Sequence, residues 1–338
     1  MMEPFGTLPT GAAAKIYFLS AAGITAGVTD YGASLVRLLI PDSSGTLADV
    51  VLGYDDANGY RQGGAFLGAT VGRNANRIRG AAFPLNGRIY PMVPNENGNN
   101  LHSGPDCYHK RLWKVEHYAD SEITFSLHSP SGDQGFPGNA DIRVTYRLDG
   151  QAGLHIVYEA VSDRDTIFNL TNHSYFNLAG HEKTELASRQ LLTIPGRYFT
   201  PADSESIPLG QLCPVAGTPM DFRAPKPIFQ DIDADYEPLK LQGGYDHNWE
   251  VFCSPCAILS DPTSGRTMSI FTDCPGIQFY AGNGLSETGK GGVYYGRHAG
   301  IALETQFYPD AIHNPQWRQP VTPASVPYRS ETVYRFTW

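Results

Sequence analysis

The sequence lacks any long hydrophobic run and any cluster of basic residues. No segment approaches 18 continuous apolar residues, so no transmembrane helix and no membrane partner are expected. The N-terminal stretch has no basic region followed by an apolar one, which argues against a secretory signal and predicts a cytoplasmic protein. The formal net charge is −9 over 338 residues, so we expect no nucleic-acid partner.

Cysteine is scarce and shows no metal-binding or disulfide pattern. The number of cysteines is odd, and the lone Cys253-Ser-Pro-Cys256 motif matches no zinc-ribbon spacing. The sequence therefore predicts free thiols and no metal site. The five cysteines are Cys107, Cys213, Cys253, Cys256 and Cys274.

Helical periodicity is also nearly absent, and the best helix candidate is a short one at residues 55–62. Between the 36 glycines and 25 prolines lie short alternating runs such as "SLVRLLI", "DIRVTYRL" and "ETVYRFTW". About twenty strands of this kind predict an all-β fold, a large antiparallel β-sandwich or barrel. The strands run from near Lys15 to Trp338 without a break in composition, so we interpret residues 1–338 as a single domain.

Four segments concentrate polar residues that ordinary strands and turns do not need. In the last of them, alternation places Glu304 on one strand face with Ala302 and Gln306. Two shorter stretches, "GYDHNW" and "GIQFYAGN", add Asp246 and Gln278. The four segments are "GRNANRIRG" (72–80), "NENGNNLHSG" (95–104), "NLTNHSYFNL" (169–178) and "GIALETQFYPDAIHNP" (300–315).

Each of these residues alone has a structural explanation. Glu304 could be a solvated strand residue or half of a salt bridge, His102 a solvated loop residue and His173 a hydrogen-bonded core histidine. Arg73 and Arg79 could simply pair with carboxylates. Together, a carboxylate in an apolar strand and two histidines suit reversible proton transfer on a polyhydroxylated substrate. Each general acid or base in such a reaction contributes roughly 10²–10⁴ in rate.

Six motifs, in this order, resemble the aldose 1-epimerase (galactose mutarotase) family: "GRNANRI", "NNLHSG", "TNHSYFNL", "YDHN", "QFYAGN" and "ALETQFYPDAIHNP". The resemblance covers nearly the whole chain. It implies a galactose mutarotase-like β-supersandwich with an open sugar cleft and no cofactor. It also implies an isomerase that interconverts the α and β anomers of free aldoses such as galactose and glucose.

The same resemblance implies roles for individual residues. Glu304 falls on the general base that takes the proton of the anomeric hydroxyl, and His173 on the acid that protonates the ring oxygen. His102 falls on a histidine that helps to hold the sugar near that oxygen. Four further residues fall on positions that hydrogen-bond sugar hydroxyls: Asn76, Arg77, Asp246 and Gln278.

One departure from the family pattern and three alternative functions remain. The stretch "GPDCYHKRLW" replaces a Gly-Phe-Asp-Lys-like segment and is expected to place Cys107 and His109 near the cleft rim. The alternatives are a hexose-6-phosphate 1-epimerase, a non-catalytic carbohydrate-binding module and a glycosidase using Asp246 and Glu304. We expect a monomer or weak homodimer, and the sequence does not rank galactose against glucose or pentoses.

Overall fold

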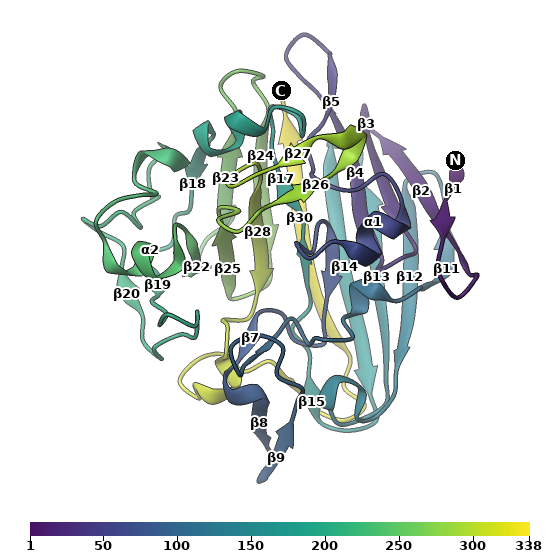
Figure 1. Cartoon of the computed structure of the whole chain (residues 1–338), viewed down its shortest axis with the longest axis vertical. Helices are drawn as coiled ribbons and strands as arrows, with labels where there is room; N and C mark the ends of the chain where they lie inside the picture. The colour runs from purple at the N-terminus through teal and green to yellow at the C-terminus, as the bar shows by residue number, and fades with distance from the viewer.

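The computed structural model describes all 338 residues, and antiparallel β-strands dominate it (Figure 1). The largest sheet has nine strands, and its middle strands alternate buried apolar with exposed polar residues. In one of them Ile142 and Val144 are buried while Asp141 and Arg143 are exposed, so one face of the sheet covers the core. From edge to edge the strands are β11 (Lys114–Tyr118), β12 (Glu122–Ser129), β13 (Ala140–Leu148), β14 (Gly153–Ser162), β30 (Tyr328–Thr337), β24 (Thr267–Thr272), β23 (Ala257–Ser260), β18 (Leu191–Thr193) and β21 (Lys226–Pro227).

Two smaller sheets pack against the nine-stranded one, which confirms the predicted sandwich. The ring of Tyr17 in the five-stranded sheet lies 6.0 Å from that of Phe125 in β12. In the six-stranded sheet, the Phe176 ring lies 5.1 Å from that of Tyr334 in β30. A core of 55 buried residues fills the space between the sheets.

The smaller sheets keep the antiparallel pairing throughout. The five-stranded sheet consists of β1 (Met2–Thr7), β2 (Ala13–Ala21), β3 (Ile24–Thr29), β4 (Ser34–Pro41) and β5 (Leu47–Asp49). The six-stranded sheet consists of β17 (Tyr175–Phe176), β28 (Ile301–Gln306), β25 (Gly276–Tyr280), β22 (Asp246–Glu250), β19 (Tyr198–Thr200) and β20 (Cys213–Pro214).

Ten short strands form isolated pairs, and these explain why the structure has thirty strands where the sequence suggested about twenty. These strands have only two to four residues each, too few to show a clear alternation. The pairs are β6 (Ala69–Val71) with β16 (Thr171–His173), β7 (Arg77–Ile78) with β10 (Asn100–Leu101), β8 (Ala82–Leu85) with β9 (Arg88–Pro91), β15 (Thr166–Ile167) with β29 (Val321–Thr322), and β26 (Glu287–Thr288) with β27 (Tyr294–Tyr295).

Two short α-helices complete the fold. The expected one is α1 (Ala57–Gln62), which Asp56 caps by accepting a hydrogen bond from the backbone N–H of Gly59. The other, α2 (Glu237–Gln242), was not predicted, because six residues are too few for a clear periodic signal. Neither helix has the length or the apolar character needed to cross a membrane. The five cysteines are free, as predicted.

The strand expected over residues 169–178 is interrupted. Both the backbone N–H and the hydroxyl of Ser174 donate to the side-chain oxygen of Asn172, at 3.1 and 2.5 Å. Because this local bonding competes with a strand ladder, the segment divides into β16, which pairs with β6, and β17, which pairs with β28.

Strand β28 is buried along its whole length. Leu303 belongs to the main core, whereas Ala302 packs into a second cluster of 15 buried residues beside it. The strand therefore has no solvated face, and Glu304 is only 2% exposed. A solvated role for this carboxylate is thus excluded.

Candidate functional site

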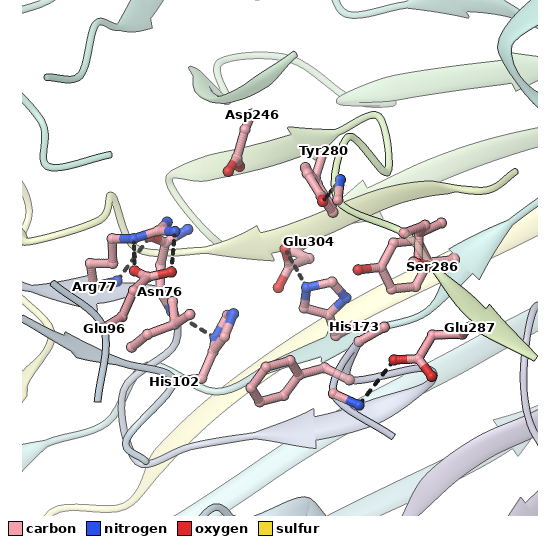
Figure 2. A pocket seen from close by; sticks show the side chains of 17 residues that line it. Asn76, Arg77, Glu96, His102, His173, Asp246, Tyr280, Ser286, Glu287 and Glu304 are labelled. Carbon is pink, nitrogen blue, oxygen red and sulfur yellow. Dashed lines mark hydrogen bonds and ion pairs between the residues drawn. The ribbon is translucent and has the colours of Figure 1, made fainter. Parts of the chain in front are cut away.

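A cavity of about 250 Å³ lies over the six-stranded sheet, and Glu304 forms part of its lining (Figure 2). This volume is below the roughly 300–1,000 Å³ typical of sites for drug-sized ligands, so the cavity suits a smaller molecule. Only six of its 17 lining residues are hydrophobic, which favours a polar ligand. Six of the seven predicted site residues line it: Asn76, Arg77, His102, His173, Asp246 and Glu304.

Two loops hold Asn76 and His102 against each other. The backbone N–H of Asn76 donates to Nδ1 of His102 at 3.1 Å, and the backbone N–H of His102 donates to the Asn76 carbonyl at 3.0 Å. Both residues have left-handed backbones, with φ of 61° and 51°. Such conformations cost roughly 1–2 kcal/mol for non-glycine residues and persist only where the surroundings stabilise them. In a neutral His102 ring the proton therefore sits on Nε2.

His173 and Glu304 approach each other from two different strands. His173 ends β16, and its Nε2 lies 3.5 Å from Oε1 of Glu304 in β28. Their side chains are 6% and 3% exposed. Nδ1 of His173 and Oε2 of Glu304 are buried and make no hydrogen bond within the protein. This close, sheltered pair of one base and one acid is what a proton-transfer site requires.

Burial favours the neutral forms of all three titratable groups at the centre of the cavity. Loss of solvation raises the pKa of Glu304 well above its ordinary value; nearby Asp246 adds to this shift and Arg77 opposes it. Loss of solvation also lowers the pKa of His173 to about 4 and the pKa of His102 well below its usual range. Between the lowered pKa of His173 and the raised pKa of Glu304, the pair therefore holds one proton.

Three adjacent strands supply the polar floor of the cavity. Gln278 in β25 lies directly opposite Glu304 in β28, and Asp246 begins β22 on the other side. The side-chain amide of Gln278 donates to Oδ1 of Asp246 at 2.7 Å. Gln278 does not line the cavity itself, so its observed contact with the site is through Asp246.

His102, His173 and Glu304 also have the residue types of a metal site, with possible ligand atoms within 4.8 Å of one another. A metal-binding histidine normally donates its second ring N–H to a carboxylate or carbonyl. In His102 the second nitrogen instead accepts from the Asn76 N–H, so the proton faces the cavity on Nε2. This arrangement suits donation to a ligand oxygen better than coordination of a metal.

Comparison with known proteins agrees with this site. The family model described as aldose 1-epimerase matches residues 15–335. The aldose 1-epimerase of Haemophilus influenzae is 39% identical over 301 residues, covering 88% of this chain and 87% of the relative. The chain belongs to the aldose 1-epimerase family. It is accordingly an isomerase of the mutarotase type.

Further relatives extend the similarity over the whole epimerase fold. The human galactose mutarotase is 36% identical over 340 residues, covering 98% of this chain and 97% of the relative. A crystal structure of an aldose epimerase homologue from C. elegans has a TM-score of 0.88 at 30% identity, covering 96% of this chain and 99% of that one. The galactose 1-epimerase of Lactobacillus acidophilus has a TM-score of 0.87 at 28% identity, covering 100% and 98%.

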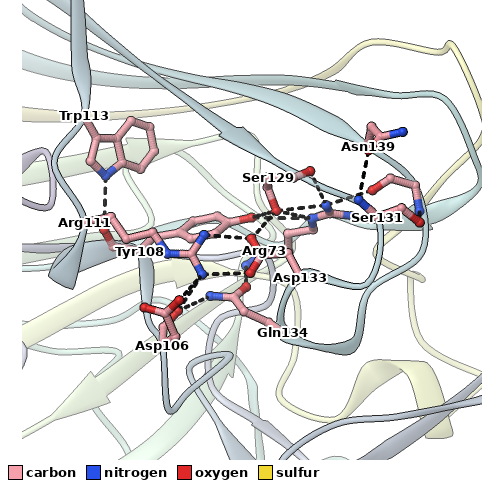
Figure 3. A network of polar contacts seen from close by, with 11 residues as sticks. Arg73, Asp106, Tyr108, Arg111, Trp113, Ser129, Ser131, Asp133, Gln134 and Asn139 are labelled. Atoms are coloured by element: carbon pink, nitrogen blue, oxygen red, sulfur yellow. Dashed lines mark hydrogen bonds and ion pairs between the residues drawn. The ribbon is translucent and has the colours of Figure 1, made fainter.

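Arg73, the most prominent arginine of the first motif, does not line the epimerase cavity. Figure 3 shows it within a polar network that includes Tyr108 and Ser129. Arg73 is completely buried, and its guanidinium donates to the carbonyls of Ser129, Pro137 and Gly138, each at 2.9 Å. The expectation of a carboxylate partner is therefore wrong for Arg73. The same expectation is correct for Arg79, whose Nε lies 3.7 Å from Oδ2 of Asp310.

The expected position of Cys107 and His109 at the cleft rim is also wrong. Both residues are buried and neither lines the cavity. The ring of Phe66 lies between His109 and the cavity residue His102. Its centroid is 4.7 Å from the centroid of the His109 ring and 4.8 Å from that of the His102 ring. The stretch that differs from the family pattern therefore lies behind the lining of the epimerase site and not at its rim.

Sequence reasoning missed several cavity residues. Phe66, which stacks on His173 at 5.9 Å, carries no local polar motif that would reveal it. Glu96 lies inside the polar loop that was singled out for His102, and Glu287 inside a glycine-rich stretch that matched no phosphate-binding motif. Only Glu96 and Glu287 had a signal in the sequence, namely a charged residue in an otherwise neutral, turn-rich loop.

Proposed function

We propose that Glu304 and His173 catalyse the interconversion of α and β anomers in a free aldose such as galactose or glucose. Glu304 takes the proton from the C1 hydroxyl while His173 gives a proton to the ring oxygen. The C1–O5 bond breaks, and the open-chain aldehyde rotates about C1–C2. The same steps in reverse close the ring on the other face and return both protons. The single observation that carries this proposal is the 3.5 Å approach of His173 Nε2 to Glu304 Oε1 in a buried, polar cavity.

The pKa shifts support a reaction that starts from one shared proton. Burial raises the pKa of Glu304 and lowers the pKa of His173, so in the empty site the proton rests on Glu304. Transfer of that proton to His173 produces the required base and acid without changing the net charge of the cavity. Sugar hydroxyls that donate to Glu304 favour this transfer, because hydrogen bonds stabilise the ionised carboxylate.

The remaining residues hold the sugar. His102 presents Nε2–H toward the cavity and suits an oxygen acceptor such as the ring oxygen. Asn76, Arg77 and Asp246 offer donors and acceptors to the hydroxyls, and Gln278 supports Asp246. The free aldose as substrate, a cytoplasmic location and a monomeric or weakly dimeric state belong to this proposal.

The charges of the cavity disfavour the hexose 6-phosphate alternative. Arg77 is the only cation in the lining, whereas Glu96, Asp246, Glu287 and Glu304 are four carboxylates. Arg73 is committed to backbone carbonyls elsewhere, and Arg79 does not line the cavity. A phosphate group would therefore meet more negative than positive charge.

The test is polarimetry of freshly dissolved α-galactose and α-glucose. Glu304→Gln and His173→Asn should each lower the mutarotation rate by roughly 10²–10⁴ while calorimetry still detects galactose binding. A wild-type protein that leaves the spontaneous rate unchanged, or a Glu304→Gln variant close to the wild-type rate, would contradict the proposal. A chromogenic glycoside serves as the control, because a glycosidase would release sugar from it and a mutarotase would not.

A further inference from the structure

Building on the proposed function, we infer that Glu96 is a positioning residue that fixes the guanidinium of Arg77 for the sugar hydroxyls. Glu96 accepts from two nitrogens of Arg77, with Oε2 2.5 Å from Nε and Oε1 3.0 Å from Nη2 (Figure 2). Such a two-point contact fixes the plane of the guanidinium as well as its position. The third nitrogen, Nη1, makes no hydrogen bond to the protein and is free for a ligand.

The Glu96 carboxylate is itself held in place by the loop from which it comes. The backbone N–H of Asn99 donates to the Glu96 carbonyl at 2.8 Å and closes a turn. Next to it, the side chain of Asn95 accepts from the Leu101 N–H and donates to the Leu101 carbonyl, at 2.7 and 3.0 Å. Leu101 in turn pairs with Arg77 between β10 and β7. Glu96 and Arg77 thus share one rigid backbone unit.

The charges around Arg77 explain why it needs such a partner. Arg77 lies near the carboxylates of Asp246 and Glu304, both of which help to raise its pKa. An arginine side chain is long and flexible, and in a sheltered cavity without a fixed partner it would turn toward another nearby carboxylate. If it turned to Asp246, that pair would close part of the sugar site. Glu96 prevents this by occupying Nε and Nη2 of the guanidinium, so that only Nη1 is left for another partner.

A pairing that merely stabilises the fold is the alternative explanation. The exposed fractions are 12% for the Arg77 side chain and 29% for Glu96, so the pair is partly buried and a contribution to folding stability has to be separated from a contribution to binding. The chain offers a control: Glu116 accepts from Nε of Arg143 at 2.7 Å, has a 30% exposed side chain and does not line the cavity. A structural role predicts similar behaviour for the two glutamates.

The experiment compares mutarotation kinetics of Glu96→Gln and Glu116→Gln. Glu96→Gln should raise KM for galactose about tenfold with little change in kcat, because Arg77 binds substrate and transition state alike. Glu116→Gln should leave both constants unchanged. Glu96→Asp, which keeps the charge on a shorter side chain, should recover part of the lost affinity. In an Arg77→Lys background, Glu96→Gln should raise KM for galactose by less than twofold.

Two results would overturn the inference. If wild type mutarotates and Glu96→Gln leaves KM unchanged, the positioning role fails while the proposed function stands. If Glu96→Gln raises KM equally in the Arg77→Lys background, Glu96 acts independently of Arg77. A wild-type protein without mutarotase activity would instead refute the proposed function and this role together.

Discussion

At the scale of single residues, the role proposed for Glu304 conflicts with the stability of the fold. A carboxylate buried beside another carboxylate opposes folding, and the partial compensation by Arg77 does not restore the ordinary pKa of Glu304. The core packing of β28 would accept a neutral side chain in its place. The site therefore retains a group that the proposed mechanism requires and that the fold would be more stable without.

This conflict predicts a pH-dependent stability difference between wild type and Glu304→Gln. In the unfolded chain Glu304 loses its proton at the ordinary pKa, whereas in the folded protein it keeps the proton until the raised pKa is passed. Between these values the folded state binds more protons, so rising pH destabilises wild type through this group. The Glu304→Gln variant has no such titrating group at this position. The difference between its Tm and the Tm of wild type should therefore grow in favour of the variant from pH 5 to pH 8. Thermal denaturation of both proteins checks this; an equal difference at both pH values would contradict it.

A site residue could be predicted from the sequence where its immediate neighbours in the chain made it unusual. His173 and Glu304 stood out because polar groups interrupt apolar strands, and alternation gave the correct face for Glu304. Their mutual approach was not derivable, because it depends on how β16 and β28 are brought together by pairing with different strands. Arg73 was misjudged for the same reason: its carbonyl partners come from the end of β12 and the loop after it, more than 50 residues away in sequence.

At the scale of elements, the position of β16 depends on a close backbone contact at Gly68. Its N–H donates to the His173 carbonyl at 3.0 Å, and its carbonyl accepts from Leu35 at 2.9 Å. The backbone at Gly68 is left-handed, with φ of +66°, and an added Cβ would lie 1.9 Å from the Leu35 carbonyl oxygen. Only glycine fits there, so one residue fixes the spacing between β4, β6 and the strand that carries His173.

Gly68→Ala is therefore expected to destabilise the protein by about 2–4 kcal/mol, from left-handed strain together with overpacking against backbone. The measurement is urea-induced unfolding. Gly87→Ala is the matched control, since Gly87 has a φ of +74° but no atom within 4 Å of an added Cβ. Gly87→Ala should lower the free energy of unfolding only by the cost of the backbone strain, about 1–2 kcal/mol. Equal losses in the two variants would show that the close contact at Gly68 relaxes.

At the scale of the whole molecule, the single-domain interpretation of residues 1–338 stays a prediction that the core makes testable. The 55-residue core contains side chains from all three large sheets, including Leu19, Phe279 and Tyr334. In a sandwich whose layers share one core, the layers should unfold together in one cooperative transition. We expect one calorimetric transition that coincides with the loss of tryptophan fluorescence. Two resolved transitions would show that the sheets unfold as separate units.

The place of β30 in the nine-stranded sheet has a consequence for how the chain folds. This strand, yellow in Figure 1, lies between β14 and β24 and is the only connection between the two halves of the sheet. It comes after all the other described strands in chain order, so both halves of the sheet keep an open edge until residues 328–337 have been synthesised. Open edges recruit other strands, and pairing over such long sequence separations is slow. We therefore expect a stage in the folding of the newly made chain at which aggregation competes with completion of the sheet.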